Sequence, residues 1–270
     1  MSTLIVIPAR QGSTRLPGKP LIALAGHTLL ARAIGIGRQA ASQLNGARLV
    51  VATDDETIAA AARGQGIESV LTSASLDSGS ARAHAAYMVL GGNEDIIVNL
   101  QGDAVFTPPG HVEAIVRGCE FSGADVTTPA VRLTWEQLDA LRVAKANSPS
   151  SGTTCIGDDD GRAIWFSKAV IPFIRNESTH RDLSLLSPVR QHVGLYCYRP
   201  HILAQMLSTP PSPYEQIEGL EQLRLLAMGV DLRLVDVPAG RVMMSGIDTP
   251  ADLRRAEDLI ARYGDPHLDR

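Results

Sequence analysis

Three cationic side chains lie close together near the start of the chain, in a loop bounded by glycine and proline. Arg10, Arg15 and Lys19 belong to the segment ARQGSTRLPGKP, which also contains Gly12 and Gly18. Glycine lets backbone N–H groups approach a phosphate chain closely, and three cations can neutralise a triphosphate. The loop therefore predicts nucleotide binding, with contacts and charge stabilisation from Ala9, Arg10, Gly12, Ser13, Arg15 and Lys19.

Two common phosphate-binding motifs do not match this loop. A Walker A motif needs four residues between its glycines and a Ser or Thr after its lysine. Here five residues separate Gly12 from Gly18, and Pro20 follows Lys19. Proline has neither a hydroxyl for magnesium nor an N–H for a phosphate oxygen. The fingerprint G-x-G-x-x-G is absent from the loop as well, so the spacing argues against a kinase-like P-loop protein.

Apolar strands and amphipathic helices alternate through the first half of the chain and must position this loop. We expect strands at 4–9, 48–53, 69–72 and 96–100, and helices at 28–41, 55–63 and 82–90. This alternation predicts an α/β fold with a mainly parallel sheet and helices on both faces. Ligands bind such sheets at the carboxyl ends of the strands. The loop after Ala9, Thr53 with Asp54, and Gln101 with Asp103 should therefore meet at one cleft.

The second half of the chain has a less regular pattern. Residues 146–160 are rich in Ser, Thr, Gly and Asp, which is typical of a mobile loop or an irregular hairpin. Strands are expected at 162–171, 192–198 and 232–237, and one helix at 214–228. Thr249 can cap a final helix that starts at Pro250, with Asp252 three residues after the cap. No repeat or long linker divides the chain, so we expect a single domain over 1–270.

Composition excludes several classes of protein. The chain has 270 residues, 44% of them hydrophobic, and a net charge of −4, which argues against a general nucleic-acid binder. Cys119, Cys155 and Cys197 form no C-x-x-C pair, which argues against a disulfide framework or a cysteine-rich zinc site. No segment approaches the roughly 18–20 apolar residues that cross a bilayer. We expect a cytoplasmic protein with no membrane or nucleic-acid partner.

Several segments together resemble one known family, the 3-deoxy-manno-octulosonate (KDO) cytidylyltransferases, or CMP-KDO synthetases. The chain contains, in that family's order, IPARQGSTRLPGKPL, VVATDDETIA, VNLQGD, WFSKAVIP, HVGLYCYR, SPYEQIEGLEQLR and GIDTPADL. Ser78, Gly79 and Arg82 stand where the family has its S-G-T-E-R segment. The similarity runs from Leu4 to about Ile260. It implies a Rossmann-like nucleotidyltransferase fold with a small β-containing lobe for acceptor binding and dimerisation.

The resemblance also implies a reaction and a set of parts. An oxygen of an acidic acceptor attacks the α-phosphate of CTP with Mg²⁺, and pyrophosphate leaves. The nucleotide-binding part would cover about 1–130, the acceptor and dimerisation part about 131–245, and a C-terminal helix about 249–262, in a homodimer. The metal ligands would be Asp103 and Asp248, and carboxylates suit Mg²⁺.

The remaining site residues follow from the resemblance and from the strand ends. The expected nucleotide neighbours are Thr53, Asp54, Ser78, Gly79, Arg82 and Gln101, and an amide can pair with the edge of cytosine. The expected acceptor neighbours are Arg175, His192, Glu218, Glu221 and Gln222. Other roles are open for some of them: Arg82 as a solvated helix residue, His192 as a hydrogen-bonded strand histidine, and Glu218 or Glu221 as a solvent-facing residue on one shared helix.

The acceptor side departs from the family pattern. Ala104 and Val105 replace the Glu and Pro of its Q-G-D-E-P motif, Ala81 replaces the Glu of S-G-T-E-R, and 147–154 lacks its N-x-V-K-V pattern. KDO or a related 2-keto-sugar acid is the expected acceptor. The alternatives are a small phosphonate such as phosphonoformate and a non-catalytic nucleotide-binding homologue, which the retained aspartates oppose. Because each unpaired acceptor hydroxyl costs about 1–3 kcal/mol, the departures predict good use of CTP and poor use of KDO.

Overall fold

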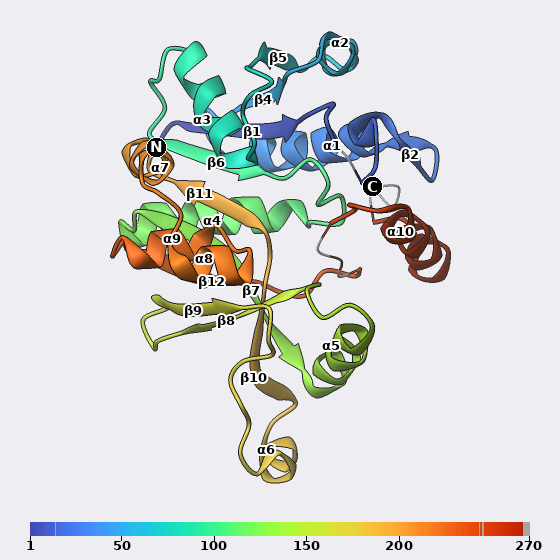
Figure 1. Cartoon of the computed structure of the whole chain (residues 1–270), viewed down its shortest axis with the longest axis vertical. Coiled ribbons are helices and arrows are strands. Elements are labelled where there is room, and N and C mark those ends of the chain that lie inside the picture. Colours follow the sequence, from blue (N-terminus) through green and yellow to red (C-terminus); the bar gives the residue numbers. More distant parts are fainter. Residues whose placement is uncertain (14, 243, 245, 267–270) are drawn as a thin grey trace.

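A long sheet runs through the molecule in the computed structural model, which describes residues 1–13, 15–242, 244 and 246–266. Its first part is parallel and has the strand order β5-β4-β1-β6. The bounds are β1 (Thr3–Ala9), β4 (Arg48–Thr53), β5 (Glu68–Leu71) and β6 (Ile96–Leu100). These strands occupy the upper part of Figure 1. The parallel sheet predicted for the first half of the chain is confirmed.

Helices cover both faces of this parallel part, as the alternating pattern predicted. They are α1 (Leu29–Gln43), α2 (Glu56–Gly64), α3 (Gly79–Val89), α4 (Pro109–Ser122) and α7 (Pro200–Ser208). Successive side chains of a strand point to opposite faces of the sheet. Ile5 and Ile7 of β1 accordingly share an apolar cluster with α1 and α4, whereas Leu4 and Val6 share another with α3 and α7.

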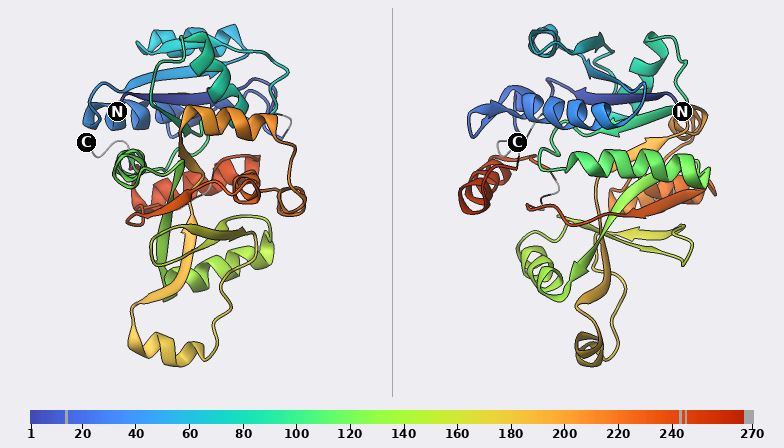
Figure 2. Two further views of the ribbon diagram at one scale, coloured as in Figure 1. Left: turned by 90° about the vertical axis from the view of Figure 1, so that its left-hand side faces the viewer. Right: turned by 180° about the vertical axis from the view of Figure 1, so that it is seen from behind.

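Beyond β6 most strand pairs are antiparallel. The sheet continues in the order β11-β7-β10-β8-β9, and β12 pairs in parallel with β7. The bounds are β7 (Val126–Thr134), β8 (Thr153–Gly157), β9 (Ala163–Ser167), β10 (Leu186–His192), β11 (Leu195–Tyr198) and β12 (Leu232–Asp236). Strands β8 to β10, with α5 (Trp135–Asn147) and α6 (Glu177–Leu183), form a lobe below the parallel part in Figures 1 and 2.

The helix expected at 214–228 is in fact two short helices, α8 (Pro213–Glu218) and α9 (Gln222–Ala227). Gly219 ends α8 with φ 65, in the left-handed region that side chains disfavour. Glu218 and Glu221 therefore do not share a helix, and the expectation that they do was wrong.

The strands of the second half are shorter than expected, and residues 146–160 contain ordered structure. The strand expected at 162–171 covers only Ala163–Ser167. The strand expected at 192–198 is divided, because the chain bends after His192 and Leu195 N–H donates to the carbonyl of Val193 (2.7 Å). Strands β8 and β9 form a hairpin with a register shift at Gly157, so the irregular-hairpin alternative is confirmed.

Small elements beside the first loop complete the fold. They are the 3-10 helix η1 (Lys19–Leu21), strands β2 (Ala23–Leu24) and β3 (His27–Thr28), and helix α10 (Pro250–Tyr263). Thr249 caps α10 in a capping box with Asp252, as predicted. Among the described residues, no helix has both the length and the apolar character that a membrane span requires.

Candidate active site

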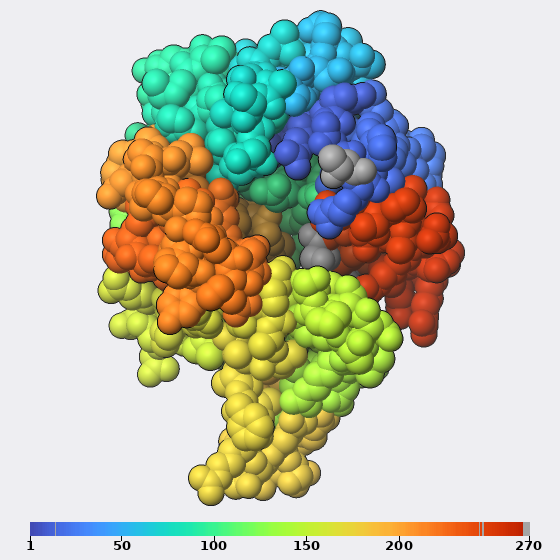
Figure 3. Space-filling view, in the orientation of Figure 1, coloured from blue at the N-terminus to red at the C-terminus, as the bar shows by residue number. Residues whose placement is uncertain are grey.

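A cleft of about 210 Å³ lies at the ends of the parallel strands β1 and β6. Figure 3 shows a hollow in the surface between the N-terminal segment and the second half of the chain. The sequence-predicted residues that line the cleft are Ala9, Arg10, Ser13, Arg15, Lys19, Ser78, Gly79, Arg82, Gln101, Asp103 and Asp248. Segments far apart in the sequence thus meet at one place, as the strand ends predicted.

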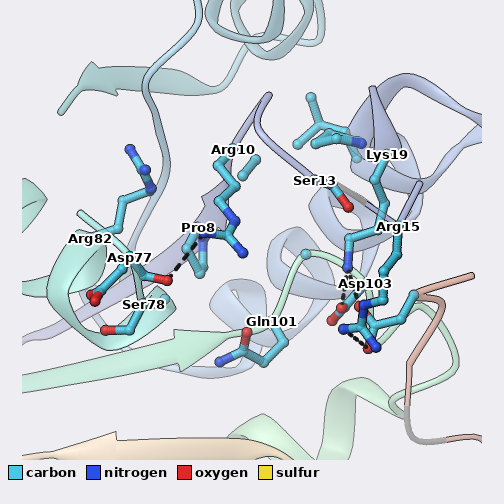
Figure 4. Close-up of a pocket in the computed structure, with 16 residues that line it drawn as sticks. Pro8, Arg10, Ser13, Arg15, Lys19, Asp77, Ser78, Arg82, Gln101 and Asp103 are labelled. Atoms are coloured by element: carbon cyan, nitrogen blue, oxygen red, sulfur yellow. Dashed lines mark hydrogen bonds and ion pairs between the residues drawn. The ribbon is translucent and has the colours of Figure 1, made fainter. Parts of the chain in front are cut away.

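Lys19 joins two carboxylates from distant parts of the chain. Its Nζ lies 2.5 Å from Oδ2 of Asp103, a pair drawn in Figure 4, and 2.9 Å from Oδ1 of Asp248. Nη2 of Arg15 lies 3.4 Å from the other oxygen of Asp248. Burial alone would lower the pKa of Lys19, but the two carboxylates outweigh it and raise this pKa above its ordinary value. The ammonium is therefore charged at any physiological pH.

Local structure explains why these charged groups meet. Gly18 has φ 66, which lets the chain turn directly into η1 at Lys19. Leu16 from the first loop, Phe106 from the segment after β6 and Ile247 from the segment before α10 belong to one apolar cluster. Burial of these side chains holds the three segments together.

The other end of the cleft is formed by Arg10 and the start of α3. Nη1 of Arg10 donates to the carbonyl of Asp77 (3.2 Å), and Ser78 Oγ accepts from the N–H of Ala81 (3.1 Å) and caps the helix. A helix N-terminus favours negative charge. The cleft therefore presents cations and the positive end of a helix together.

Five lining residues were not among the sequence predictions: Pro8, Asp77, Pro20, Leu30 and Gly102. All of them directly adjoin predicted residues or motifs except Leu30, whose position on α1 gave no signal. Gly102 is required for packing, because a Cβ there would lie 2.8 Å from the backbone oxygen of Pro8. Glycine at this position lets the ends of β1 and β6 approach each other.

Three residues expected at the nucleotide do not line the cleft. Gly12 is exposed in the first loop and Thr53 is fully buried, with its Oγ1 accepting from the N–H of Asp55 (3.2 Å). Asp54 is engaged within the protein, since Oδ1 accepts from Gln11 N–H (3.0 Å) and Oδ2 from Arg82 (3.1 Å). The strand ends predicted that Thr53 and Asp54 lie near the cleft, but they did not predict the directions of the two side chains.

His192, from the acceptor set, is a buried and hydrogen-bonded histidine. Its Nε2 lies 2.9 Å from Oγ1 of Thr128, and its ring contacts the rings of Phe166 and Tyr196. Burial, with a further contribution from the charge of Lys168, lowers the pKa of His192 to about 3. The imidazole is therefore neutral at physiological pH and is unsuited to donate a proton to substrate.

Glu218 organises a polar group near His192 that includes a lysine missed in the sequence. Glu218 accepts from Ser167 Oγ (2.7 Å) and from the backbone N–H of Lys168 (2.8 Å). Nζ of Lys168 donates to Thr153 Oγ1 (3.3 Å). Burial lowers the pKa of Lys168, which Glu218 partly opposes. The signal for Lys168 was its place in WFSKAVIP, directly after an apolar strand.

The other acceptor candidates are separate from this group. Glu221 accepts from Ser80 Oγ (2.6 Å), and burial raises its pKa. Gln222 is buried, and its Nε2 has no hydrogen-bond partner among the described residues. Arg175 is exposed, and it lines neither the cleft nor a second cavity, whose wall includes His192.

Sequence comparisons place this chain among known enzymes. The family model described as "Cytidylyltransferase" matches residues 4–232. The 3-deoxy-manno-octulosonate cytidylyltransferase of Maricaulis maris is 39% identical over 267 residues, which cover 98% of this chain and 99% of that protein. The protein of the same name from Bacteroides thetaiotaomicron is 36% identical over 96% of this chain and 98% of its own length.

The chain belongs to the CMP-KDO synthetase family. The CMP-KDO synthetases are cytidylyltransferases, a class of nucleotidyltransferase, so both the enzyme class and the family resemblance predicted from the sequence are confirmed.

Solved structures agree with this assignment. A CMP:2-keto-3-deoxy-manno-octonic acid synthetase complexed with CTP has a TM-score of 0.80 and 32% identity, and the match covers 97% of this chain and 99% of that one. A cytidylyltransferase from Leptospira borgpetersenii has a TM-score of 0.56 at 17% identity, a likeness that concerns the fold alone. The predicted nucleotidyltransferase fold is therefore confirmed.

Two carboxylates of the cleft suit the metal that the family resemblance implied. One oxygen of Asp103 and one of Asp248 converge on a single cation, the Lys19 ammonium, at 2.5 and 2.9 Å. In the part of the chain that the structure describes, no group of three or more His, Cys, Asp or Glu side chains could hold an ion. Mg²⁺ is usually bound by one or two carboxylates together with water and substrate phosphates. The donor set thus suits a Mg²⁺ ion whose other ligands come from a nucleotide.

The low pKa of His192 predicts a pH-dependent loss of stability. Histidine in the unfolded chain has a pKa of about 6.5, so the unfolded state binds more protons below that pH. The free energy of unfolding should therefore fall between pH 6.5 and the folded pKa of about 3, by up to about 1.4 kcal/mol per pH unit. His192→Gln keeps a hydrogen-bonding group toward Thr128 and removes the titration. Urea unfolding between about pH 7 and 5 should show a shallower decline for the variant; identical slopes would contradict the assignment.

Proposed function

We propose that the chain transfers a cytidylyl group from CTP to KDO in a Mg²⁺-dependent reaction, giving CMP-KDO and pyrophosphate. The observation that carries this proposal is the convergence of Arg10, Arg15 and Lys19 with Asp103 and Asp248 in one cleft. The synthetase with 32% identity and a TM-score of 0.80 was solved in complex with CTP, which supports the choice of nucleotide.

The residues of the cleft suit a direct displacement at the α-phosphate. Such a reaction requires positioned reactants and neutralised phosphate charge rather than a covalent nucleophile. Arg10, Arg15 and Lys19 would bind the triphosphate and stabilise the charge that develops on pyrophosphate. Asp103 and Asp248 would hold Mg²⁺, which when bound supplies further charge neutralisation and orients the reactants.

Two lysines, Lys145 and Lys168, contact the segment 147–154, which lacks the family's lysine. Nζ of Lys145 donates to the carbonyls of Ser151 (2.7 Å), Gly152 (2.7 Å) and Lys168 (2.6 Å), so this loop is anchored by a cation from α5. Lys168 itself lies beside Thr153. Lys145 has its N–H groups engaged by carbonyls, so only Lys168 could replace the missing lysine toward an acceptor. The poor use of KDO expected from the sequence stays a prediction until the kinetics are measured.

Pyrophosphate release with CTP, Mg²⁺ and a set of acceptors tests the proposed function. We expect turnover with KDO and none with phosphonoformate. A kcat/KM for KDO of at least about 10⁴ M⁻¹s⁻¹ would show that the departures from the family pattern are neutral, and a much lower value would confirm the poor use of KDO predicted from the sequence. Turnover with phosphonoformate alone would favour the phosphonate alternative. Binding of CTP with no release of pyrophosphate for any sugar acid or phosphonate would favour the non-catalytic alternative.

Replacing Lys168 by Met should weaken binding of the acceptor and leave binding of the nucleotide unaffected. The methionine keeps most of the apolar stem but removes the ammonium beside Thr153. Loss of a charged hydrogen-bonding partner for an acceptor carboxylate corresponds to about 1.5–3 kcal/mol, or roughly tenfold to over a hundredfold in KM for KDO. Calorimetric titration with CTP serves as the internal control. A normal KM for KDO in the variant would remove Lys168 from the acceptor site.

We also propose that the enzyme is a homodimer joined through the lobe. Phe173, Leu183 and Leu185 are between 79% and 92% exposed, and an exposed group of large apolar side chains is typical of protein interfaces. Sedimentation at micromolar concentration should give twice the mass of the chain; a monomer would contradict the proposal. The cytoplasmic location expected from the sequence stays a prediction.

A further inference from the structure

Arg82 lines the cleft, yet its terminal nitrogens are bonded to the protein. The residue is 2% exposed and lies in the first turn of α3. Nη1 donates to Thr72 Oγ1 (2.5 Å) and to the carbonyl of Ser73 (3.4 Å). Nη2 donates to Asp54 Oδ2 (3.1 Å) and to the carbonyl of Leu76 (3.2 Å). In Figure 4 the side chain extends away from the end of the cleft that contains Lys19 and Asp103.

Asp54 connects Arg82 to the nucleotide-binding loop. One carboxylate oxygen accepts from Arg82, and the other accepts from the backbone N–H of Gln11 (3.0 Å). Gln11 directly follows Arg10, which lines the cleft. A single buried ion pair therefore links the start of α3, the segment after β5, the end of β4 and the loop after β1.

The contacts of Arg82 favour an indirect role in nucleotide binding. Removing the partner of a buried arginine leaves an unpaired charge inside the protein, which is strongly destabilising. We therefore expect Arg82 to stay paired with Asp54. Its planar guanidinium bonds to two segments at once, the one after β5 and the one after β4, whereas a lysine offers one nitrogen. Gln11 and Gly12 are exposed, and the neighbouring Arg10 is bonded through Nη1 to the carbonyl of Asp77 (3.2 Å).

We propose that Arg82 is a positioning residue: it acts through Asp54 to fix the backbone of Gln11 and thereby the phosphate-binding loop, and does not contact the nucleotide. The proposal rests on the proposed function only for the identity of the nucleotide, CTP. It assigns Arg82 a role different from direct nucleotide binding, which the sequence favoured.

Amide hydrogen exchange of Gln11 in the ligand-free protein tests the first link. Arg82→Lys and Asp54→Asn should each speed exchange of the Gln11 amide at least tenfold, while amides of β4 keep their protection. Arg32→Lys is the matched control, since Arg32 is 3% exposed, pairs with Asp265 and does not line the cleft. Unchanged Gln11 exchange in Arg82→Lys, or an equal increase in Arg32→Lys, would overturn the proposal.

A double-mutant cycle on CTP affinity tests the second link. If Arg82 acts only through Asp54, each single variant raises the CTP dissociation constant about tenfold and the double variant lies within about threefold of the weaker single variant. If the two effects multiplied, the CTP dissociation constant of the double variant would rise about a hundredfold. That result would show an independent contact between Arg82 and the nucleotide and would overturn the proposal. If Arg82→Lys does not fold, Asp54→Asn alone must still accelerate Gln11 exchange.

The two readouts separate this proposal from the proposed function. If the wild-type chain does not bind CTP, the proposed function fails, but the exchange rate of Gln11 still decides whether Arg82 holds the loop. If CTP binds and pyrophosphate is not released, the cycle on CTP affinity remains valid.

Discussion

Replacing Asp103 by Asn is expected to lower kcat at least about a thousandfold, or about 4 kcal/mol, with little change in melting temperature. The substitution preserves the shape of the side chain and removes the charge that, with Asp248, would hold Mg²⁺ against the triphosphate. Asp103 is partly exposed and contacts Lys19 at 2.5 Å, so the main effect of replacing it by Asn is electrostatic. Asp248→Asn should have a similar effect, because both carboxylates face the same cation position.

The measurement is the initial rate of pyrophosphate release with saturating CTP and KDO, over a range of Mg²⁺ concentrations. Asp236→Asn is the control, since this carboxylate also pairs with an arginine, Arg190, but belongs to β12 and does not line the cleft. It should turn over at the wild-type rate. If both cleft variants have normal rates at limiting Mg²⁺, the metal assignment is wrong.

The position of the cleft was predictable because it depends on topology. Alternating strands and helices require a parallel sheet, and a parallel sheet brings the ends of β1 and β6 to one edge. The first loop and the segment around Asp103 were therefore placed together before any contact was known. The capping box of α10 was also predictable, since Thr249 and Asp252 need only local geometry.

Side-chain direction was much less predictable than position. Thr53 and Asp54 follow a strand as expected, yet one is buried and the other is bonded to Arg82 and Gln11. The direction of the Asp54 side chain depends on Arg82, 28 residues away in the chain, and on Gln11, 43 residues away, which periodicity does not reveal. The break between α8 and α9 was missed because a helical apolar pattern continues across Gly219, whose left-handed φ decides the local structure.

Replacing Lys19 by Ala is expected to change metal affinity and turnover in opposite directions. In the free protein the Lys19 ammonium lies 2.5 Å from Asp103 and 2.9 Å from Asp248, where it competes with any divalent cation for the same oxygens. Its removal should tighten binding of Mn²⁺ to the nucleotide-free protein at least about tenfold, or 1.4 kcal/mol. The same change removes a cation from the triphosphate site and should slow turnover of CTP at least about tenfold.

Titration of Mn²⁺ followed by electron paramagnetic resonance, without CTP, measures the first effect, and steady-state kinetics measures the second. Arg15→Ala is the matched control: Arg15 is 66% exposed and touches only one oxygen of Asp248, at 3.4 Å. Arg15→Ala should weaken the binding of CTP while leaving the affinity for Mn²⁺ nearly unchanged. Equal or weaker Mn²⁺ binding by Lys19→Ala would show that the lysine does not occupy the ion position in solution. Tighter binding combined with slower turnover would mean that Lys19 leaves the carboxylates when nucleotide and metal enter together, because only then can its charge serve the phosphates.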